Sequence, residues 1–188
     1  GLSFFLPFVL SIAGFGSLSD ENRNKSARFA LTRVSRKQFL LGHYLASVAT
    51  AITALLVLCI SLCLYLVFNS PPADILPVLG WSLYGFMMLS LTAAAACAVG
   101  LFFSTLTNWS GLAVLMTVGA FLGVGILSLA LRSQPLLSGV MVLLLPLRAV
   151  PFLFHHHPAM VTAAAAAMLV YAALYTRVGL SLYRRRDV

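Results

Sequence analysis

Residues 19–46 read SDENRNKSARFALTRVSRKQFLLGHYLA, and this stretch organises the rest of the chain. It is the one long polar segment in an apolar chain, with an apolar run before it and another after it. It holds two of the four acidic residues and six of the twelve Lys and Arg residues: Asp20, Glu21, Arg23, Lys25, Arg28, Arg33, Arg36 and Lys37. A basic segment between two membrane spans is typical of a cytoplasmic connection, and residues 19–37 are named the elbow here.

The composition places the chain in a membrane. Of its 188 residues, 61% are hydrophobic and only 9% are charged, whereas a soluble domain has about 45–50% apolar and about 25% charged residues. The sequence therefore predicts an all-α integral membrane protein with a single transmembrane domain over residues 1–188. The net charge of +8 indicates which helix ends face the cytoplasm, and no nucleic-acid partner is expected because no phosphate-binding loop or long basic tail is present.

Five apolar segments are long enough to cross a hydrocarbon core of about 30 Å. They are residues 1–18, 39–68, 77–104, 109–131 and 159–182. Residues 39–68 form the longest of them and are expected to tilt or to protrude at one end. Trp81 and Tyr84 near the start of the third segment predict an aromatic anchor at the outer interface.

The apolar segment at 135–157 is interrupted by Pro146, Arg148 and Pro151. If it crossed the membrane, the basic tail at 184–187 would lie on the opposite side from the elbow, against the positive-inside rule. We therefore predict a re-entrant or interfacial helical hairpin on the outer face and a cytoplasmic C-terminus. Ten Lys and Arg residues then lie inside, and two, Arg132 and Arg148, lie outside.

The elbow itself is predicted to form a short helix at about 20–36 on the membrane surface. Asp20 lies in its first turn, where the helix dipole favours an anion. Ala27, Leu31 and Val34 recur at helical spacing and give an apolar stripe among the cations.

The elbow resembles the signature region of ABC-2-type transporter permeases. The residues that carry the resemblance are Glu21, Ser26, Ala27, Phe29, Ala30, Leu31, Val34, Ser35, Arg36, Leu40, Leu41 and Gly42. The sequence departs from the family pattern at Lys25, Arg33 and His43. The arginine-rich C-terminal tail and the order of the spans are also similar to that family.

The resemblance implies six spans, the first of which would precede this chain. It also implies that the elbow is a coupling helix docked on a separate ABC ATPase subunit, which binds ATP and Mg. The expected coupling residues are Asp20, Glu21, Arg28, Phe29, Leu31, Val34, Ser35 and Arg36. A second permease subunit, like or unlike this one, completes such an exporter, which we expect in the bacterial inner membrane.

Small residues predict where helices approach closely in lipid. They occur in AAAACAVG at 93–100 and in a predicted helix-packing set, Gly119, Gly123 and Gly125.

Four residues suggest an outer-face pathway: Arg148, His155, His156 and His157. Intramembrane cations often mark pathways, and imidazole titrates near neutral pH. The alternative interpretation is a polar cap before the last span, with Arg148 snorkelling to the interface.

Metal and catalytic chemistry find little support in the sequence. Cys59 and Cys63 lie one helical turn apart, but cysteine is also an ordinary small apolar residue in buried helices, and no metal site is predicted. Asp74 and Asp187 lack a partner acid or histidine in register, and no nucleotide-binding loop occurs. We expect no catalytic residues and no cofactor bound by this chain.

The alternative function is a non-transporting structural subunit of a larger membrane complex.

Overall fold

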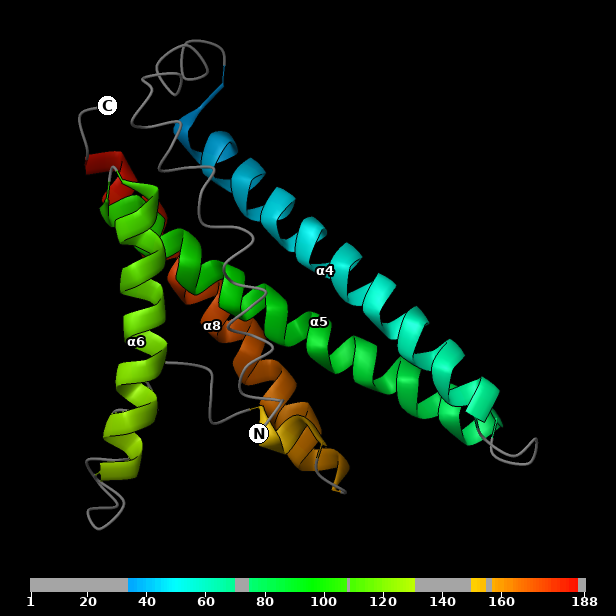
Figure 1. The fold of residues 1–188 in the computed structure, drawn as a ribbon. Coiled ribbons are helices and arrows are strands. Elements are labelled where there is room, and N and C mark those ends of the chain that lie inside the picture. The colour runs from blue at the N-terminus through cyan, green and yellow to red at the C-terminus, as the bar shows by residue number, and fades with distance from the viewer. Residues whose placement is uncertain (1–33, 70–74, 108, 131–149, 155–156, 186–188) are drawn as a thin grey trace.

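The computed structural model describes residues 34–69, 75–107, 109–130, 150–154 and 157–185. Within these ranges the chain is helical and contains no strand, which confirms the all-α class. Figure 1 shows its elements, which are α4 (Arg36–Asn69), α5 (Ile75–Leu106), α6 (Ser110–Ala130), the short 3-10 helix η3 (Pro151–Phe154) and α8 (Pro158–Arg185).

Three of these helices are long and apolar enough to cross a membrane: α4, α5 and residues 158–183 of α8. At a rise of about 1.5 Å per residue, the 34 residues of α4 and the 32 of α5 exceed the hydrocarbon thickness. The chain is therefore a membrane-embedded protein. The span predicted at 109–131 corresponds to α6, and the one predicted at 1–18 lies outside the described residues, so the count of five stays a prediction.

The start of α4 differs from the predicted boundaries. The coupling helix was expected to run to 36 and the span to start at 39, but the chain bends at Val34 and α4 begins at Arg36. The helix begins there because Ser35 and Gln38 form a capping box. The backbone N–H of Gln38 donates to Ser35 Oγ (3.3 Å), and the backbone N–H of Ser35 donates to Gln38 Oε1 (3.2 Å). Arg36 therefore belongs to the first turn of the membrane helix.

Helix α5 is the centre of the bundle. In the most apolar stretch of each helix, 50% of the α5 residues are buried, against 11% in α4 and 17% in α8. Figure 1 shows α5 between α4 and α8, with α6 beside its C-terminal end. Small side chains of α5 contact a different helix on each face. Ala93 and Cys97 pack against α4, at Ala51 and Leu55. Ala95 packs against α8, at Ala164 and Met168, and Ala96 and Val99 pack against α6, at Phe121.

Several serine and threonine hydroxyl groups bond to the backbone of their own helix. Thr50, Ser61, Ser90, Thr92 and Thr117 each donate to the carbonyl oxygen four residues earlier, at 2.8–2.9 Å. This pattern satisfies a polar group without a neighbouring helix, which suits a helix in lipid.

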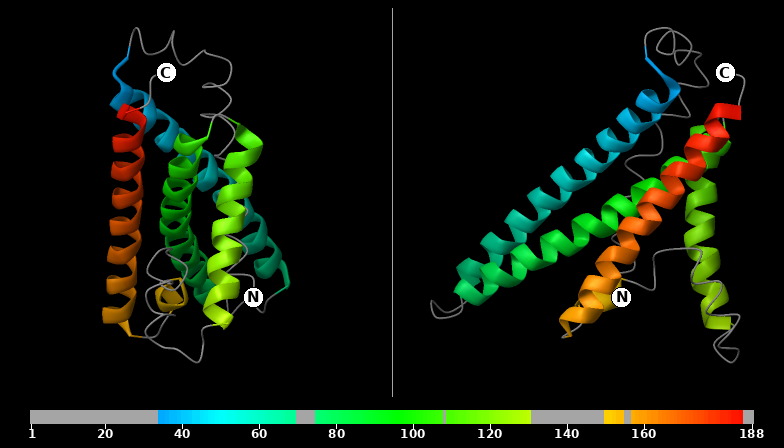
Figure 2. Two further views of the ribbon diagram at one scale, coloured as in Figure 1. Left: turned by 90° about the vertical axis from the view of Figure 1, so that its left-hand side faces the viewer. Right: turned by 180° about the vertical axis from the view of Figure 1, so that it is seen from behind.

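The helices alternate in direction. Figures 1 and 2 show that the start of α4, the end of α5, the start of α6 and the end of α8 lie at one end of the bundle, while α6 ends and α8 begins at the other. The first turn of α4 and the last turn of α8, which both carry basic residues, therefore lie at the same end. The re-entrant hairpin predicted at 135–157 lies largely outside the described residues and stays a prediction.

Candidate functional site at the basic end of the bundle

The first turn of α4 and the last turn of α8 form a basic end, which we define by Arg36, Lys37, Arg184 and Arg185. Residues directly beside these two basic turns pack α4 against α8. The rings of Phe39 and Tyr183 stack with centroids 6.4 Å apart, and Leu40 and Tyr183 are fully buried in one cluster with Leu101 of α5. This packing fixes the two basic turns beside each other.

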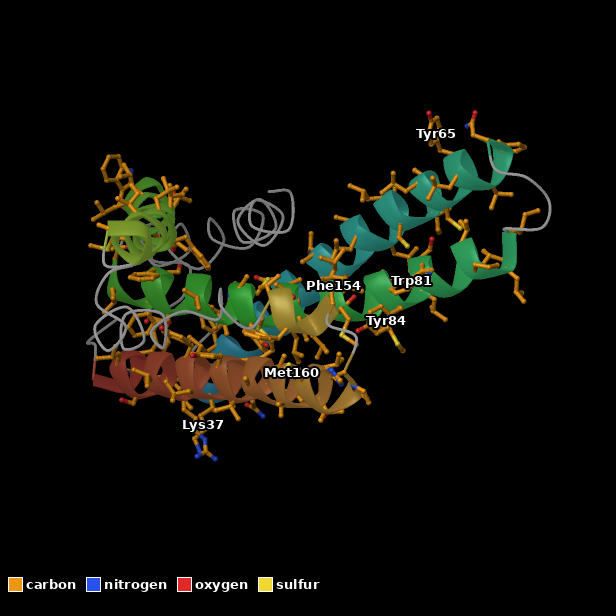
Figure 3. All side chains as sticks on the ribbon, turned by 90° about the horizontal axis from the view of Figure 1, so that it is seen from below. Lys37, Tyr65, Trp81, Tyr84, Phe154 and Met160 are labelled. Atoms are coloured by element: carbon orange, nitrogen blue, oxygen red, sulfur yellow. The ribbon has the colours of Figure 1, made fainter. Side chains whose placement is uncertain are left out.

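The helix dipole favours the cations at the end of α8 but not those at the start of α4. Cations at the C-terminus of α8 are favourable, because the helix dipole is negative there. Arg36 and Lys37 lie at the N-terminus of α4, where the dipole is positive and the first turn holds no acidic residue. No Asp or Glu lies within the described ranges. Lys37 is exposed, and its side chain projects away from α5 (Figure 3). Lys37 can thus meet an anionic surface outside the bundle.

The structure places three of the predicted coupling residues. Val34 is exposed at the bend, Ser35 caps α4, and Arg36 is its first residue. The other five lie outside the described residues: Asp20, Glu21, Arg28, Phe29 and Leu31. The three residues that are described join the elbow directly to α4.

The predicted packing glycines of α6 face no neighbour within the described part of the chain. A Cβ atom added at Gly119 or Gly123 would meet nothing within 4 Å. Gly125 lies in the same helix. By contrast, a Cβ at Gly179 of α8 would lie 3.7 Å from the Phe102 Cα, so α8 approaches the backbone of α5 closely at that glycine.

The outer-face candidates are only partly described. Arg148, His155 and His156 lie outside the described residues. His157 is exposed just before α8, and its carbonyl oxygen accepts hydrogen bonds from the amides of Met160 (3.1 Å) and Val161 (3.3 Å). Its backbone therefore helps to start α8, with Pro158 in the first helical position, where proline is favoured.

The two cysteines of α4 show no metal-binding arrangement. The Cys59 thiol donates to the Ser82 carbonyl oxygen of α5 at 3.5 Å, and Cys63 is half-buried. Among the described residues, no group of three His, Cys, Asp or Glu side chains comes together.

Some links between helices were not predicted from the sequence. The Tyr44 hydroxyl donates to the Ala94 carbonyl oxygen (3.2 Å), which ties α4 to α5 near the basic end. At the opposite end, the Tyr84 hydroxyl donates to the carbonyl oxygen of Leu153 in η3. Trp81, Tyr84 and Phe154 lie together there (Figure 3), with edge-to-face rings 5.9 and 6.2 Å apart. The aromatic residues were visible in the sequence, but their partners were not.

Comparisons with protein families, with curated proteins and with solved structures give no match. The class that the fold defines is an all-α, membrane-embedded protein with a basic end.

Proposed function

We propose that this chain is the permease subunit of an ATP-driven exporter of the ABC-2 type. The proposal assigns the elbow as the coupling helix, a separate ABC ATPase as its partner, and a second permease subunit across the transport path. ATP and Mg would bind to the partner ATPase, and this chain would carry no catalytic residue. The basic end would face the cytoplasm of a bacterial cell, at the inner membrane, where the cytoplasmic face of a span collects Lys and Arg.

One observation carries the proposal: the elbow, whose sequence resembles that family's signature, continues into α4 through the Ser35–Gln38 capping box. A push on the elbow would therefore act on the end of a long helix. Two hydrogen bonds join α4 to α5 at different points along the helices: the Tyr44 hydroxyl donates to the Ala94 carbonyl oxygen, and the Cys59 thiol donates to the Ser82 carbonyl oxygen. Motion of α4 would be passed to the centre of the bundle, as in transporters that move packed elements as rigid bodies.

The test is the ATPase activity of the complex that purifies with this chain. Arg28→Ala, Leu31→Ala and Arg36→Ala are expected to lower basal ATP hydrolysis in reconstituted vesicles, because each removes part of the elbow surface. Arg132→Ala is the matched control, since it removes a cation predicted to lie on the other side of the membrane. Unchanged hydrolysis in all three elbow variants, in complexes that still assemble, would contradict the coupling role.

The alternative, a structural subunit of a larger complex, is favoured by the glycine face of α6, formed by Gly119 and Gly123, which meets no neighbour among the described residues. That function predicts a stable complex in which no nucleotide is hydrolysed and no ATPase chain co-purifies. Mass spectrometry of the purified complex therefore separates the two functions.

A further inference from the structure

A groove of about 300 Å³ runs between α4 and α8 beneath the basic end. Its α4 wall includes Leu41 and Tyr44, and its α8 wall includes Ala173, Thr176, Arg177 and Leu180. Leu41 and Ala173 are exposed, so the groove opens outward. Both helices pack on α5, and above the groove Phe39 and Leu40 of α4 share one apolar cluster with Leu180 and Tyr183 of α8.

One polar group of the groove has no bonding partner within the described part of the chain. The Tyr44 hydroxyl is bonded to Ala94, and the Thr176 hydroxyl donates to the Ala172 carbonyl oxygen at 2.6 Å. The Arg177 guanidinium is exposed, and within the described residues it makes no ion pair or hydrogen bond. A cation inside a membrane span is costly unless an anion, water or the interface receives it.

The position of Arg177 fits the depth of a lipid headgroup. It lies eight residues before Arg185, the end of α8, which is about 12 Å along a helix. A long arginine side chain can extend towards the interface from that depth. The first turn of α4, which carries the exposed Lys37, lies at the same end of the bundle as the end of α8.

We infer that this groove binds an anionic phospholipid of the surrounding bilayer. One acyl chain lies along the apolar walls, and the headgroup phosphate contacts Arg177. A lipid fits because the site combines an apolar groove open to the side with cations at one end, and basic pockets between helices recognise anionic headgroups. The inference does not depend on the transport function.

The experiment is native mass spectrometry of the full chain, in detergent, titrated with phosphatidylglycerol or phosphatidylcholine of identical acyl chains. The wild-type chain is expected to bind phosphatidylglycerol more tightly. Arg177→Gln is expected to weaken phosphatidylglycerol binding about fivefold, the effect of one interfacial cation, and to leave phosphatidylcholine binding unchanged. Arg177→Lys keeps the charge and is expected to keep the preference.

A second variant tests the groove itself. Ala173→Phe fills the groove and is expected to lower the binding of both lipids. Ala166→Phe is its matched control: Ala166 is also exposed, lies two turns away on the same face of α8, and does not line the groove.

Equal binding of the two lipids to the wild-type chain overturns the inference, as does an Ala173→Phe variant that binds lipid like the wild type. A third result would also overturn it. If Ala173→Phe releases a second copy of the chain or a co-purifying protein in place of lipid, the groove is a protein interface.

Discussion

The alanine-rich stretch of α5 and the glycine face of α6 look alike in sequence, yet they have different surroundings. Ala93, Ala95, Ala96 and Ala98 are at most 1% exposed, because α5 is packed by neighbours on several faces. Gly119 and Gly123 of α6 meet no neighbour in the described part of the chain. Small residues thus indicate that a helix can be approached closely, but they do not say whether the partner belongs to the same chain.

The largest expected effect is at Ala95, which is enclosed by Val150, Leu153, Ala164 and Met168. Ala95→Leu is expected to lower the free energy of unfolding by about 1–3 kcal/mol, because extra methylenes overfill a packed site. The measurement is unfolding in mixed micelles with a rising fraction of SDS. Ala163→Leu, at an exposed position of α8, should show no such loss. Equal stability of the two variants would mean that α5 is not the packed centre.

Gly179 tests the close approach of α8 to α5. Gly179→Ala should be tolerated, because the new Cβ would lie 3.7 Å from the Phe102 Cα, an ordinary contact. Gly179→Leu should be less stable than Gly179→Ala by about 1–3 kcal/mol, since the longer side chain would push on the α5 backbone. The same unfolding titration measures the difference, and a leucine variant as stable as the alanine variant would show that the helices are not in contact there.

Tyr84 tests whether α5 is also fixed at its other end. Tyr84→Phe removes the hydroxyl that donates to the Leu153 carbonyl oxygen of η3 and is expected to cost about 1 kcal/mol. Tyr65→Phe is a suitable control, because Tyr65 is 66% exposed on α4. A Tyr84 variant with the unfolding midpoint of the control would show that the hydrogen bond does not stabilise η3 on α5.

The smallest change in the unfolding free energy of the isolated chain is expected at the glycine face of α6, formed by Gly119 and Gly123. Gly119→Leu and Gly119→Ala should have unfolding free energies within about 0.5 kcal/mol of each other, in contrast to the pair at Gly179. If a second permease subunit packs on this face, the double variant Gly119→Leu/Gly123→Leu should lose dimer in cross-linking experiments while the monomer stays folded. An unchanged dimer would place that interface elsewhere.

Local signals in the sequence predicted the helices well. The apolar segments at 39–68 and 77–104 correspond to α4 and α5, because length and apolar composition alone determine which segments can cross a bilayer. The start of α4 is also set by a local signal. Ser35 and Gln38 form the S-x-x-Q pattern of a capping box, so the helix start could have been read from the sequence at Arg36.

The candidate site was only half predictable. The basic residues of the elbow and the tail were visible, and the positive-inside rule predicted that they lie on one side of the membrane. The stacking of Phe39 on Tyr183, which brings the two basic turns together, joins residues far apart in the chain. The groove beside Arg177 likewise depends on how far α4 and α8 diverge on α5, and no local pattern encodes that distance.

The sequence by itself determined that this protein is helical and membrane-embedded, and where its cations gather along the chain. These properties follow from the cost of placing apolar side chains in water and charges in lipid, which each segment meets on its own. Only the tertiary structure decided that α5 is the centre, that the glycine face of α6 meets no neighbour in the described part of the chain, and that Arg177 borders a groove. In lipid, helices associate through the fit of their surfaces rather than through apolar character, and that fit exists only once the helices are together.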